Sequence, residues 1–407
     1  MSNQPIHVYL DSSDYSRLSN PSCQTESTIE IRNQLLEWSK SGQVKFLYSG
    51  ILLLEMAPME AVHTPLASLR ADLLVDLCGR NALISFDRLL TLEFASINTQ
   101  RPGGESVRSS DADWFPDLGN IISPVNWAEA IQDVDSAGKK HSLNRQHRRT
   151  LKRKIFKKNK PTKEAVRAIL GDDLTKQLDE FLGLYPMRPS DAEVLWKYVL
   201  GLTTTAEADR AFKESLRDPK WMMRWFAQHH DQMSPLIDWL RGPSKALMAD
   251  TKRMTEQASQ IVLFEETLGI PKGQRTLTKK VWNQHQDEMV VKVSSSVVTK
   301  LDPDFRGQID LNQFDQNCPG FSTCLRALHS SIWSSVGQAS RMPKDSDVVD
   351  ALHALYAPYV DVFRADSFMA PFIADQVRQN GTIVVSKLEL LVQTVQMLLH
   401  TDRTANA

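Results

Sequence analysis

Short apolar segments alternate with amphipathic segments at both ends of this chain, and this alternation constrains the fold more than any other feature. Runs such as IHVYL, VKFLY, VDVFR and TIVVS have the length and the β-branched and aromatic content of strands. The predicted strands cover residues 7–10, 44–48, 82–86, 360–364 and 382–386. The predicted helices between and after them cover residues 28–40, 51–56, 65–78, 347–356 and 387–399. Alternating strands and helices favour a parallel sheet flanked by helices, so we expect an α/β fold.

The middle of the chain lacks this alternation. NTQRPGGESVRSSDAD has the composition of a loop, and the pattern from Trp127 to Ala339 is mostly helical. Thr204 and Glu207 have the spacing of a capping box, and residues 290–298 are the one segment there that we expect to be a strand. We therefore predict an α/β domain in two parts, interrupted by a mostly α-helical insertion. The expected boundaries are 1–98 for the N-terminal part, 99–319 for the insertion and 320–407 for the C-terminal part.

Composition excludes several classes of protein. The net charge is −1 and the isoelectric point about 6.8, so the whole-chain balance gives no sign of a nucleic-acid partner. The N-terminus lacks a basic region followed by an apolar run, and no segment has the length of apolar sequence that a membrane-spanning helix needs. The cysteines form no CxxC pair, so we expect neither a disulfide framework nor a zinc site, and the cytoplasm as the compartment.

Five acidic residues stand where an α/β fold gathers its ligands. Asp11 follows the first predicted strand and Asp366 follows VDVFRA, and ligands of open α/β sheets bind at the carboxyl ends of strands. Glu55 lies in the apolar run SGILLLEM, where a carboxylate is costly without a partner. Asp347 and Asp350 are three residues apart, which places them on one helix face.

Carboxylates that converge on one cleft repel one another, and a bound cation would offset the repulsion. Mg²⁺ or Mn²⁺ is the natural choice because hard cations prefer oxygen ligands. Two such ions, about 3.5–4 Å apart, activate a water and stabilise the leaving oxygen of a phosphodiester. No Ser, Cys or His nucleophile is then required.

The order of these acids resembles that of the PIN domain family of nucleases, whose fold is a parallel sheet with helices on both sides. In that family one acid ends the first strand, a Glu lies in an early helix, a third acid begins a later helix and a fourth follows the next strand. The matching positions here are Asp11 in VYLDSSD, Glu55 in GILLLEM, Asp347 in KDSDVVDALH and Asp366 in VFRADSF. The most specific segment is SDVVDALHALYAPYVDVFRADSFM followed by GTIVVS, and the resemblance covers residues 5–98 and 320–400.

The sequence departs from the family at three points. Ser13 stands where the family often has Asn, the third acid is either Asp347 or Asp350, and the insertion is longer than the usual loop. The resemblance implies a cytoplasmic, Mg²⁺- or Mn²⁺-dependent endonuclease with these five acids around the metal. It implies RNA as the substrate, although no residue of the chain distinguishes RNA from single-stranded DNA. PIN proteins include toxins, so an inhibitor or defence-partner protein and a role as a toxin or in anti-phage defence are further expectations.

Residues 139–163 contain twelve Lys or Arg and neither Asp nor Glu. Phosphate contacts from such a segment give affinity without sequence specificity. The residues that we expect to bind nucleic acid are Arg145, Arg148, Arg149, Lys152, Arg153, Lys154, Lys157 and Lys158. The alternative is a solvated charged segment without a ligand.

Each acid also has an ordinary explanation when it is taken alone. Asp11 fits a turn or a helix N-cap, Glu55 a solvated helical position, and Asp347 a favourable charge at a helix start. Two rival functions therefore remain: a non-catalytic nucleic-acid-binding protein that uses the basic segment, and a protein-docking module with a degenerate PIN-like scaffold. The nuclease is favoured only when the acids are taken together, in this order along the chain.

Overall fold

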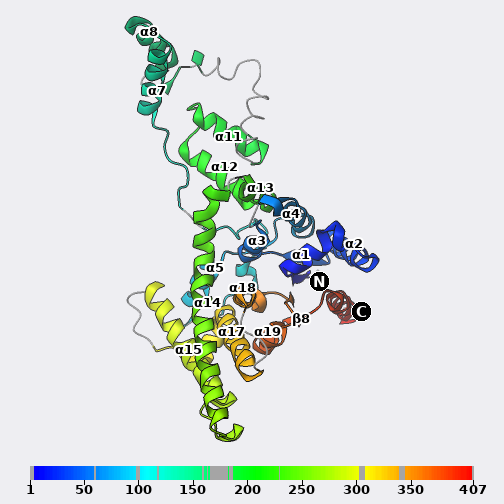
Figure 1. Ribbon diagram of the computed structural model, residues 1–407. Helices are drawn as coiled ribbons and strands as arrows, with labels where there is room; N and C mark the ends of the chain where they lie inside the picture. The colour runs from blue at the N-terminus through cyan, green and yellow to red at the C-terminus, as the bar shows by residue number, and fades with distance from the viewer. Residues whose placement is uncertain are drawn as a thin grey trace. The chain divides into compact units, whose positions relative to one another are not determined.

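The chain divides into two compact units in the computed structural model (Figure 1). Unit 1 contains residues 1–116 and 229–407, and unit 2 contains residues 117–228. The structure describes residues 4–58, 61–97, 101–116, 119–157, 160–162, 164–165, 182, 187–228, 230–301, 308–338 and 344–405.

Unit 1 is built on a four-stranded parallel sheet. Its strands are β1 (Ile6–Tyr9), β2 (Val44–Leu47), β7 (Val362–Arg364) and β8 (Ile383–Val385), in the order β2-β1-β7-β8. All three strand pairs are parallel, and Val8 of β1 stands opposite Val362 of β7 although the two are far apart in sequence. The expected parallel α/β sheet is therefore present, assembled from both ends of the chain.

The third strand expected from the sequence is shorter than predicted and belongs to another ladder. β3 (Ala82–Leu83) pairs antiparallel with β4 (Arg108–Ser109), and a single parallel bridge joins Ala82 to Tyr48, just beyond β2. α5 (Phe86–Ala95) starts directly afterwards, so residues expected at the end of a strand begin a helix instead.

Helices alternate with the strands along the chain in the first part of unit 1. They are α1 (Ser12–Ser19), α2 (Glu26–Ser41), α3 (Gly50–Met56), α4 (Thr64–Cys78), α5 and α6 (Gly104–Val107). Side-chain caps define their ends: Thr25 caps α2, and Ser49 caps α3 through its hydroxyl, which accepts from Leu52 N at 3.2 Å. Gly42 ends α2 with a φ of +71°, a backbone conformation that glycine adopts without strain.

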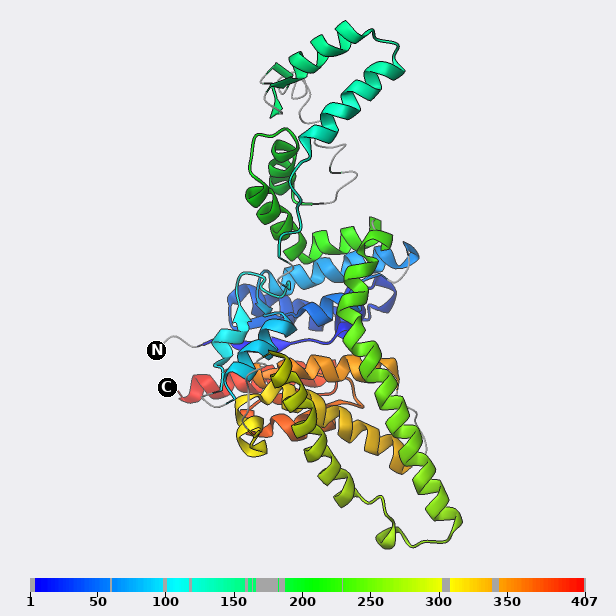
Figure 2. The same cartoon turned by 90° about the vertical axis from the view of Figure 1, so that its left-hand side faces the viewer.

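The second part of unit 1 is mainly helical. Its helices are α14 (His230–Thr267), α15 (Lys279–Leu301), α16 (Leu311–Asn317), α17 (Pro319–Gln338), α18 (Asp345–His353), α19 (Ala370–Val377) and α20 (Leu388–Ala405). α20 packs on three strands of the sheet, whereas α14 and α15 pack on α17 (Figure 2). Residues 99–116 and 229–319, which composition assigns to the insertion, thus belong to the same compact unit as the sheet.

The strand expected at residues 290–298 is wrong, because these residues lie within α15. Its buried positions are Val290, Ser294 and Val298, which are spaced by four residues and face one way along the helix. The β-branched content of VVKVSSSVV suggested a strand, but packing of this stripe determines the conformation.

The core of the sheet is aromatic. Tyr9 and Phe363, on the adjacent strands β1 and β7, are buried and stack with their ring centroids 5.1 Å apart and their planes 4° from parallel. Tyr356, in the 3₁₀ segment η4 (Ala354–Tyr359), stacks on Tyr9, with the two ring centroids 6.4 Å apart. These rings fix the point where the N-terminal and C-terminal parts of the sheet meet.

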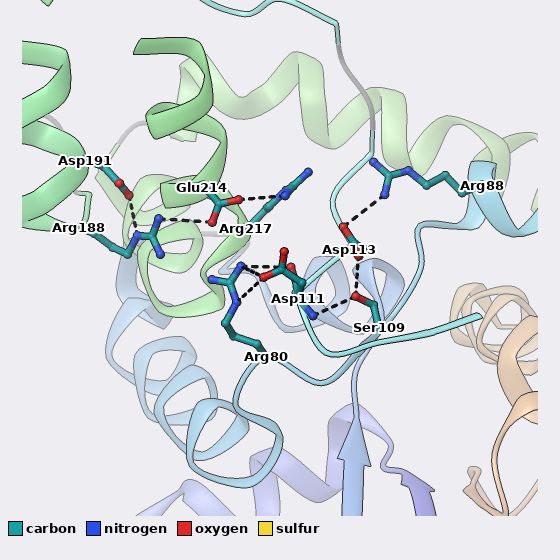
Figure 3. A network of polar contacts seen from close by, with 9 residues as sticks. All are labelled: Arg80, Arg88, Ser109, Asp111, Asp113, Arg188, Asp191, Glu214 and Arg217. Atoms are coloured by element: carbon teal, nitrogen blue, oxygen red, sulfur yellow. Dashed lines mark hydrogen bonds and ion pairs between the residues drawn. The ribbon is translucent and has the colours of Figure 1, made fainter. Parts of the chain in front are cut away.

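Polar contacts near β4 tie the loops of unit 1 together (Figure 3). Arg80 lies 2.7 Å from Asp111 through Nη2, and the Ser109 hydroxyl donates to Asp113 at 2.6 Å. Asp113 also lies 3.6 Å from Arg88 of α5. These contacts join both sides of the small antiparallel ladder to the helix that follows it.

Unit 2 is mainly helical, and its described residues include two very short strands. It contains α7 (Trp127–Lys140), α8 (Arg145–Ile155), β5 (Phe156–Lys157), β6 (Lys160–Pro161), α11 (Pro189–Val199), α12 (Thr205–Arg217) and α13 (Pro219–Gln228). α11 packs on α12 and α7 on α8. The capping box predicted for Thr204 and Glu207 is confirmed at the start of α12.

A second network shown in Figure 3 joins α11 to α12 inside unit 2. Arg188 Nε lies 2.6 Å from Asp191, and its Nη2 lies 3.5 Å from Glu214. Arg217 approaches the same Glu214 at 3.0 Å. One arginine thereby connects the first turn of α11 to the end of α12.

Across the residues that the structure describes, no helix is both long and apolar enough to cross a membrane.

Candidate active site

Two of the sequence-predicted acids lie at the same edge of the sheet. Asp11 is two residues beyond the end of β1 and Asp366 is two residues beyond the end of β7, and these strands are parallel neighbours. Strand order reverses between β1 and β7, since β2 lies outside β1 and β8 outside β7. This is the switch point at which open α/β sheets bind ligands.

Both carboxylates are held by local hydrogen bonds. Asp11 is the N-cap of α1, and its Oδ2 accepts from the backbone N–H and the hydroxyl of Ser13. Asp366 accepts through Oδ1 from the backbone N–H groups of Phe368 and Met369, each at 2.8 Å. The ordinary explanation of Asp11 as an N-cap therefore holds together with its place at the sheet edge, and these bonds fix the direction of both side chains.

Glu55 has the partner that its apolar surroundings require. Its Oε2 lies 3.0 Å from Nε2 of His353, which is buried at the end of α18. The other imidazole nitrogen, Nδ1, lies 2.6 Å from the Tyr9 hydroxyl, which in turn contacts the Ser49 hydroxyl at 2.8 Å. A continuous chain of hydrogen bonds thus runs from the N-cap of α3 through β1 and α18 back to Glu55 on α3.

This network controls the protonation of its members. Burial would raise the pKa of Glu55, but hydrogen bonds from His353 and Ser12 outweigh it and the pKa is lowered. Burial would lower the pKa of His353, but the hydrogen bond and charge of Glu55, with Asp11 and Asp350, raise it. The pair therefore favours a carboxylate beside an imidazolium.

Asp350 lies within the electrostatic field of the other acids. Burial and the neighbouring negative charges of Asp11, Asp366 and Glu55 raise the pKa of Asp350 to about 8, and His353 opposes the shift. Asp350 and His353 are three residues apart and so share a face of α18. The structure thus brings Asp11, Glu55, Asp350 and Asp366 into one acidic cluster, which is defined by these four residues.

Asp347 has a different environment. It is buried, and its Oδ2 accepts from the backbone N–H of Lys344 at 2.9 Å, which forms the capping box of α18. The reason to expect Asp347 as a metal ligand is therefore its match to the PIN pattern.

The acidic cluster suits a hard cation in its chemistry. All its donors are carboxylate oxygens, and its one cationic partner within hydrogen-bonding distance in the described structure is His353. Among the described residues, no three His, Cys, Asp or Glu side chains are arranged as a ready-made metal site.

The predicted nucleic-acid-binding residues lie mainly on α8, in unit 2. Arg145, Arg149 and Arg153 are exposed and spaced by four residues, so they form a stripe along the helix. Lys154 and Lys157 are also exposed, and Lys158 lies outside the described residues.

Arg148 and Lys152 have a different role from the exposed stripe. They face α7, where Asp135 lies 3.4 Å from Arg148 Nε and 3.6 Å from Lys152 Nζ. Lys139 approaches the same carboxylate at 3.5 Å. Two of the eight predicted residues thus pair with an acid inside the helical hairpin α7–α8.

Sequence reasoning assigned no role to several residues of the site. His353 is buried and is the hydrogen-bonding partner of Glu55. Its spacing from Asp350 was the available signal. Asp14 is buried 3.1 Å from Arg364 Nε, and burial raises its pKa to about 7, against the effect of that guanidinium.

Comparison with known proteins adds no relative: the chain matches no protein-family model, no curated protein and no solved structure.

Proposed function

We propose that this chain is a divalent-metal-dependent nuclease of the PIN-like type that hydrolyses phosphodiester bonds in RNA. The observation that supports the proposal most is the acidic cluster at the sheet switch point, where Asp350 lies half-buried among the charges of three other carboxylates. A structural role alone gives no reason to gather four acids from β1, α3, α18 and β7, since like charges in a half-buried site destabilise the fold.

The carboxylates of the cluster would bind the metal, and neighbouring hydrogen-bond donors would orient them. Asp11, Glu55, Asp350 and Asp366, with Asp347 from the PIN pattern, would hold Mg²⁺ or Mn²⁺, which supplies charge stabilisation and lowers the pKa of bound water. The hydrogen bonds of Ser13 and of the Phe368 and Met369 backbone orient the carboxylates of Asp11 and Asp366.

The His353 imidazole positions Glu55 in the same way that partners of metal ligands do elsewhere. It contacts Glu55 on one side and Tyr9 on the other, so it connects the carboxylate to the buried core of the sheet. Glu55 is thereby held at the cluster by a residue that has no need to touch the substrate.

One observation favours a second function, a nucleic-acid-binding protein without catalysis. The exposed stripe Arg145, Arg149 and Arg153 belongs to a compact unit of its own, so binding of a phosphate backbone there does not depend on the acidic cluster.

Cleavage of end-labelled single-stranded RNA and DNA in Mn²⁺ or Mg²⁺ separates the two functions. The wild-type protein, Asp11→Asn, Asp350→Asn and Asp366→Asn would be compared with Glu30→Gln, which removes an exposed acid from α2. The nuclease predicts metal-dependent cleavage by wild type and Glu30→Gln and loss in the three cluster variants. Salt-sensitive binding without cleavage, equal in all five proteins, would instead support the binding protein.

A further inference from the structure

A cavity of about 300 Å³ in unit 1 opens beside Glu55 and contains a cationic side chain. It lies where α1, α3 and α4 approach one another, and Ser16, Glu55, His63, Leu66 and Arg70 are among the residues that line it. The acidic cluster therefore has a cavity beside it that carries a positive charge. The carboxylates of the cluster do not account for this charge.

Within the described structure, the guanidinium of Arg70 has N–H groups that make no hydrogen bond to the protein. Its Nη1 donates to the Ser16 hydroxyl at 3.3 Å, and within the described structure its buried Nε has no hydrogen-bond partner. No ion pair within 4.0 Å joins it to Glu55 among the described side chains, although the two charges attract each other. A guanidinium has five N–H donors, and Ser16 accepts from one of them, so the N–H groups of Arg70 that line the cavity have capacity for a ligand with oxygen acceptors.

The rest of the lining suits one nucleotide unit. Leu66, with 41% of its surface exposed, forms an apolar wall with Ala57 and Pro58. His63, at the N-cap position of α4, makes no side-chain capping bond, and the first turn of α4 begins at the cavity. The partial positive charge of this helix start adds to the charge of Arg70.

The cavity continues from the acidic cluster along α1. Ser12, the first residue of α1, hydrogen-bonds Glu55, and Ser16, one turn later, accepts the hydrogen bond of Arg70. One helical turn rises about 5.4 Å, a step of the same order as that between successive phosphates on an extended strand. A strand with one phosphate at the acidic cluster would thus bring a neighbouring phosphate to Arg70.

We propose that this cavity is a phosphate subsite: Arg70 binds, through its guanidinium fork, the phosphate next to the one that is cleaved, while Leu66, Ala57 and Pro58 contact the attached sugar. The inference deepens the proposed nuclease function and rests on it, because the two phosphates belong to one strand. Arg matches phosphate oxygens in a bidentate geometry that Lys does not reproduce.

Single-phosphate replacement tests this assignment. A fluorescein-labelled single-stranded 2′-O-methyl RNA pentanucleotide and four versions, each with one neutral methylphosphonate linkage, would be titrated against the protein in Ca²⁺ by fluorescence anisotropy. The proteins are wild type, Arg70→Gln, Arg70→Lys and Arg17→Gln, the last removing an exposed arginine of α1 that pairs with Glu389.

The subsite predicts that one methylphosphonate weakens binding to wild type and Arg17→Gln by about tenfold, as expected for a charged hydrogen bond. In Arg70→Gln the same replacement has little further effect, and Arg70→Lys falls between. Absence of binding to wild type, or equal effects of every linkage in wild type and Arg70→Gln, would overturn the subsite.

Parallel cleavage assays in Mn²⁺ keep this result apart from the nuclease itself. Cleavage by wild type without the coupling to Arg70 would leave the nuclease standing and remove the phosphate subsite. Coupling without cleavage would leave the subsite in place and contradict the proposed catalysis.

Discussion

His353 lies between Glu55 and the buried core, with Nε2 3.0 Å from the Glu55 carboxylate and Nδ1 2.6 Å from the Tyr9 hydroxyl. The imidazole thereby links α18, from the C-terminal part of unit 1, to β1 and α3 from the N-terminal part. Two segments separated by most of the chain thus share one buried hydrogen-bond network, and the network ends at the acidic cluster.

Replacement of His353 by Ala should destabilise the protein. It removes the partner of a half-buried carboxylate and of a fully buried tyrosine hydroxyl, so we expect the free energy of unfolding to fall by about 2–3 kcal/mol. Urea denaturation followed by circular dichroism measures the change. His285→Ala, at an exposed position of α15, is the control and should change little; equal effects of the two variants would show that the network contributes nothing.

Binding of a cation by the acidic cluster should stabilise the folded state. A cation that binds only the folded protein contributes about 2.7 kcal/mol at a hundred times its Kd, so Mn²⁺ should raise the melting temperature of the wild type. Asp11→Asn and Asp366→Asn should abolish this increase, because each removes a charge at the sheet edge. Differential scanning fluorimetry with and without Mn²⁺ decides the question, and an unchanged increase in both variants would place the ion elsewhere.

A buried acidic side chain binds the N-terminus of α17. Glu93 of α5 accepts from the backbone N–H groups of Gly320 at 2.7 Å and Phe321 at 2.9 Å, and from the Tyr359 hydroxyl. A carboxylate at a helix N-terminus satisfies donors that have no partner within the helix. Glu93 therefore connects α5, α17 and η4.

Stability should depend on pH through Glu93. Burial raises its pKa to about 7, although Tyr359 and the two backbone N–H groups lower it. Because the folded pKa exceeds the unfolded value of about 4.3, the contribution is complete below about pH 4.3 and is lost as pH rises through about 7. Urea denaturation at pH 5 and pH 7.5 should show a loss of about 2.5 kcal/mol from this group. In Glu93→Gln, whose amide resembles the protonated acid, the loss should be smaller; the same slope in both proteins would contradict the assignment.

Gly320, at the start of α17, lies too close to its neighbours to accommodate a side chain. A Cβ at this position would lie 2.3 Å from the Leu355 carbonyl oxygen and 2.7 Å from Glu93 Oε1. Since backbone must shift to accept it, Gly320→Ala should reduce stability by about 2–3 kcal/mol, as overpacking does. The control is Gly273→Ala, where nothing lies within 4 Å. Thermal unfolding compares them, and an equal melting temperature for both variants would argue against the tight contact.

The sequence predicts the sheet well because its strands have a strong local signal. VKFLY and VDVFR form short buried strands where apolar runs indicated them. Residues 290–298 fail for the opposite reason: Gln286 and Ser294 interrupt the apolar stripe of α15, so the helical period is hidden among β-branched residues. Burial of those polar groups against α17 depends on long-range packing, which local pattern does not contain.

The acids of the site were visible in sequence, but their partners were not. Asp11 and Asp366 follow apolar runs, so the parallel sheet alone brings them to one edge. The contact of His353 with Tyr9 joins residues on different elements, and a tyrosine within a strand gives no sign that its hydroxyl bonds a distant imidazole. The same holds for Arg70, whose place beside Glu55 depends on the packing of α1 against α4.

The exposed stripe of α8 provides a test of nucleic-acid binding that does not require cleavage. Arg145, Arg149 and Arg153 lie on one exposed face, so replacing all three by Gln should weaken binding of single-stranded RNA. On a single strand each lost phosphate contact lowers the dependence of log K on log salt by about 0.7, so the slope should fall by about 2. Fluorescence anisotropy at several NaCl concentrations measures it. A triple variant of the exposed Lys40, Lys45 and Lys292 in unit 1 is the matched control.

Replacement of Asp135 should strengthen RNA binding by α7 and α8, whereas replacement of the exposed arginines should weaken it. Its carboxylate lies within 4 Å of Arg148, Lys152 and Lys139. Burial raises the pKa of Asp135, but these three cations together outweigh it and lower the pKa, so the side chain is charged at neutral pH. Asp135→Asn removes one negative charge and releases those cations toward solvent. We therefore expect tighter RNA binding and a steeper salt dependence than in wild type. Weaker binding would mean that Asp135 instead holds the hairpin of α7 and α8 in the shape that binds RNA, and unchanged binding would show that α8 does not contact the phosphates.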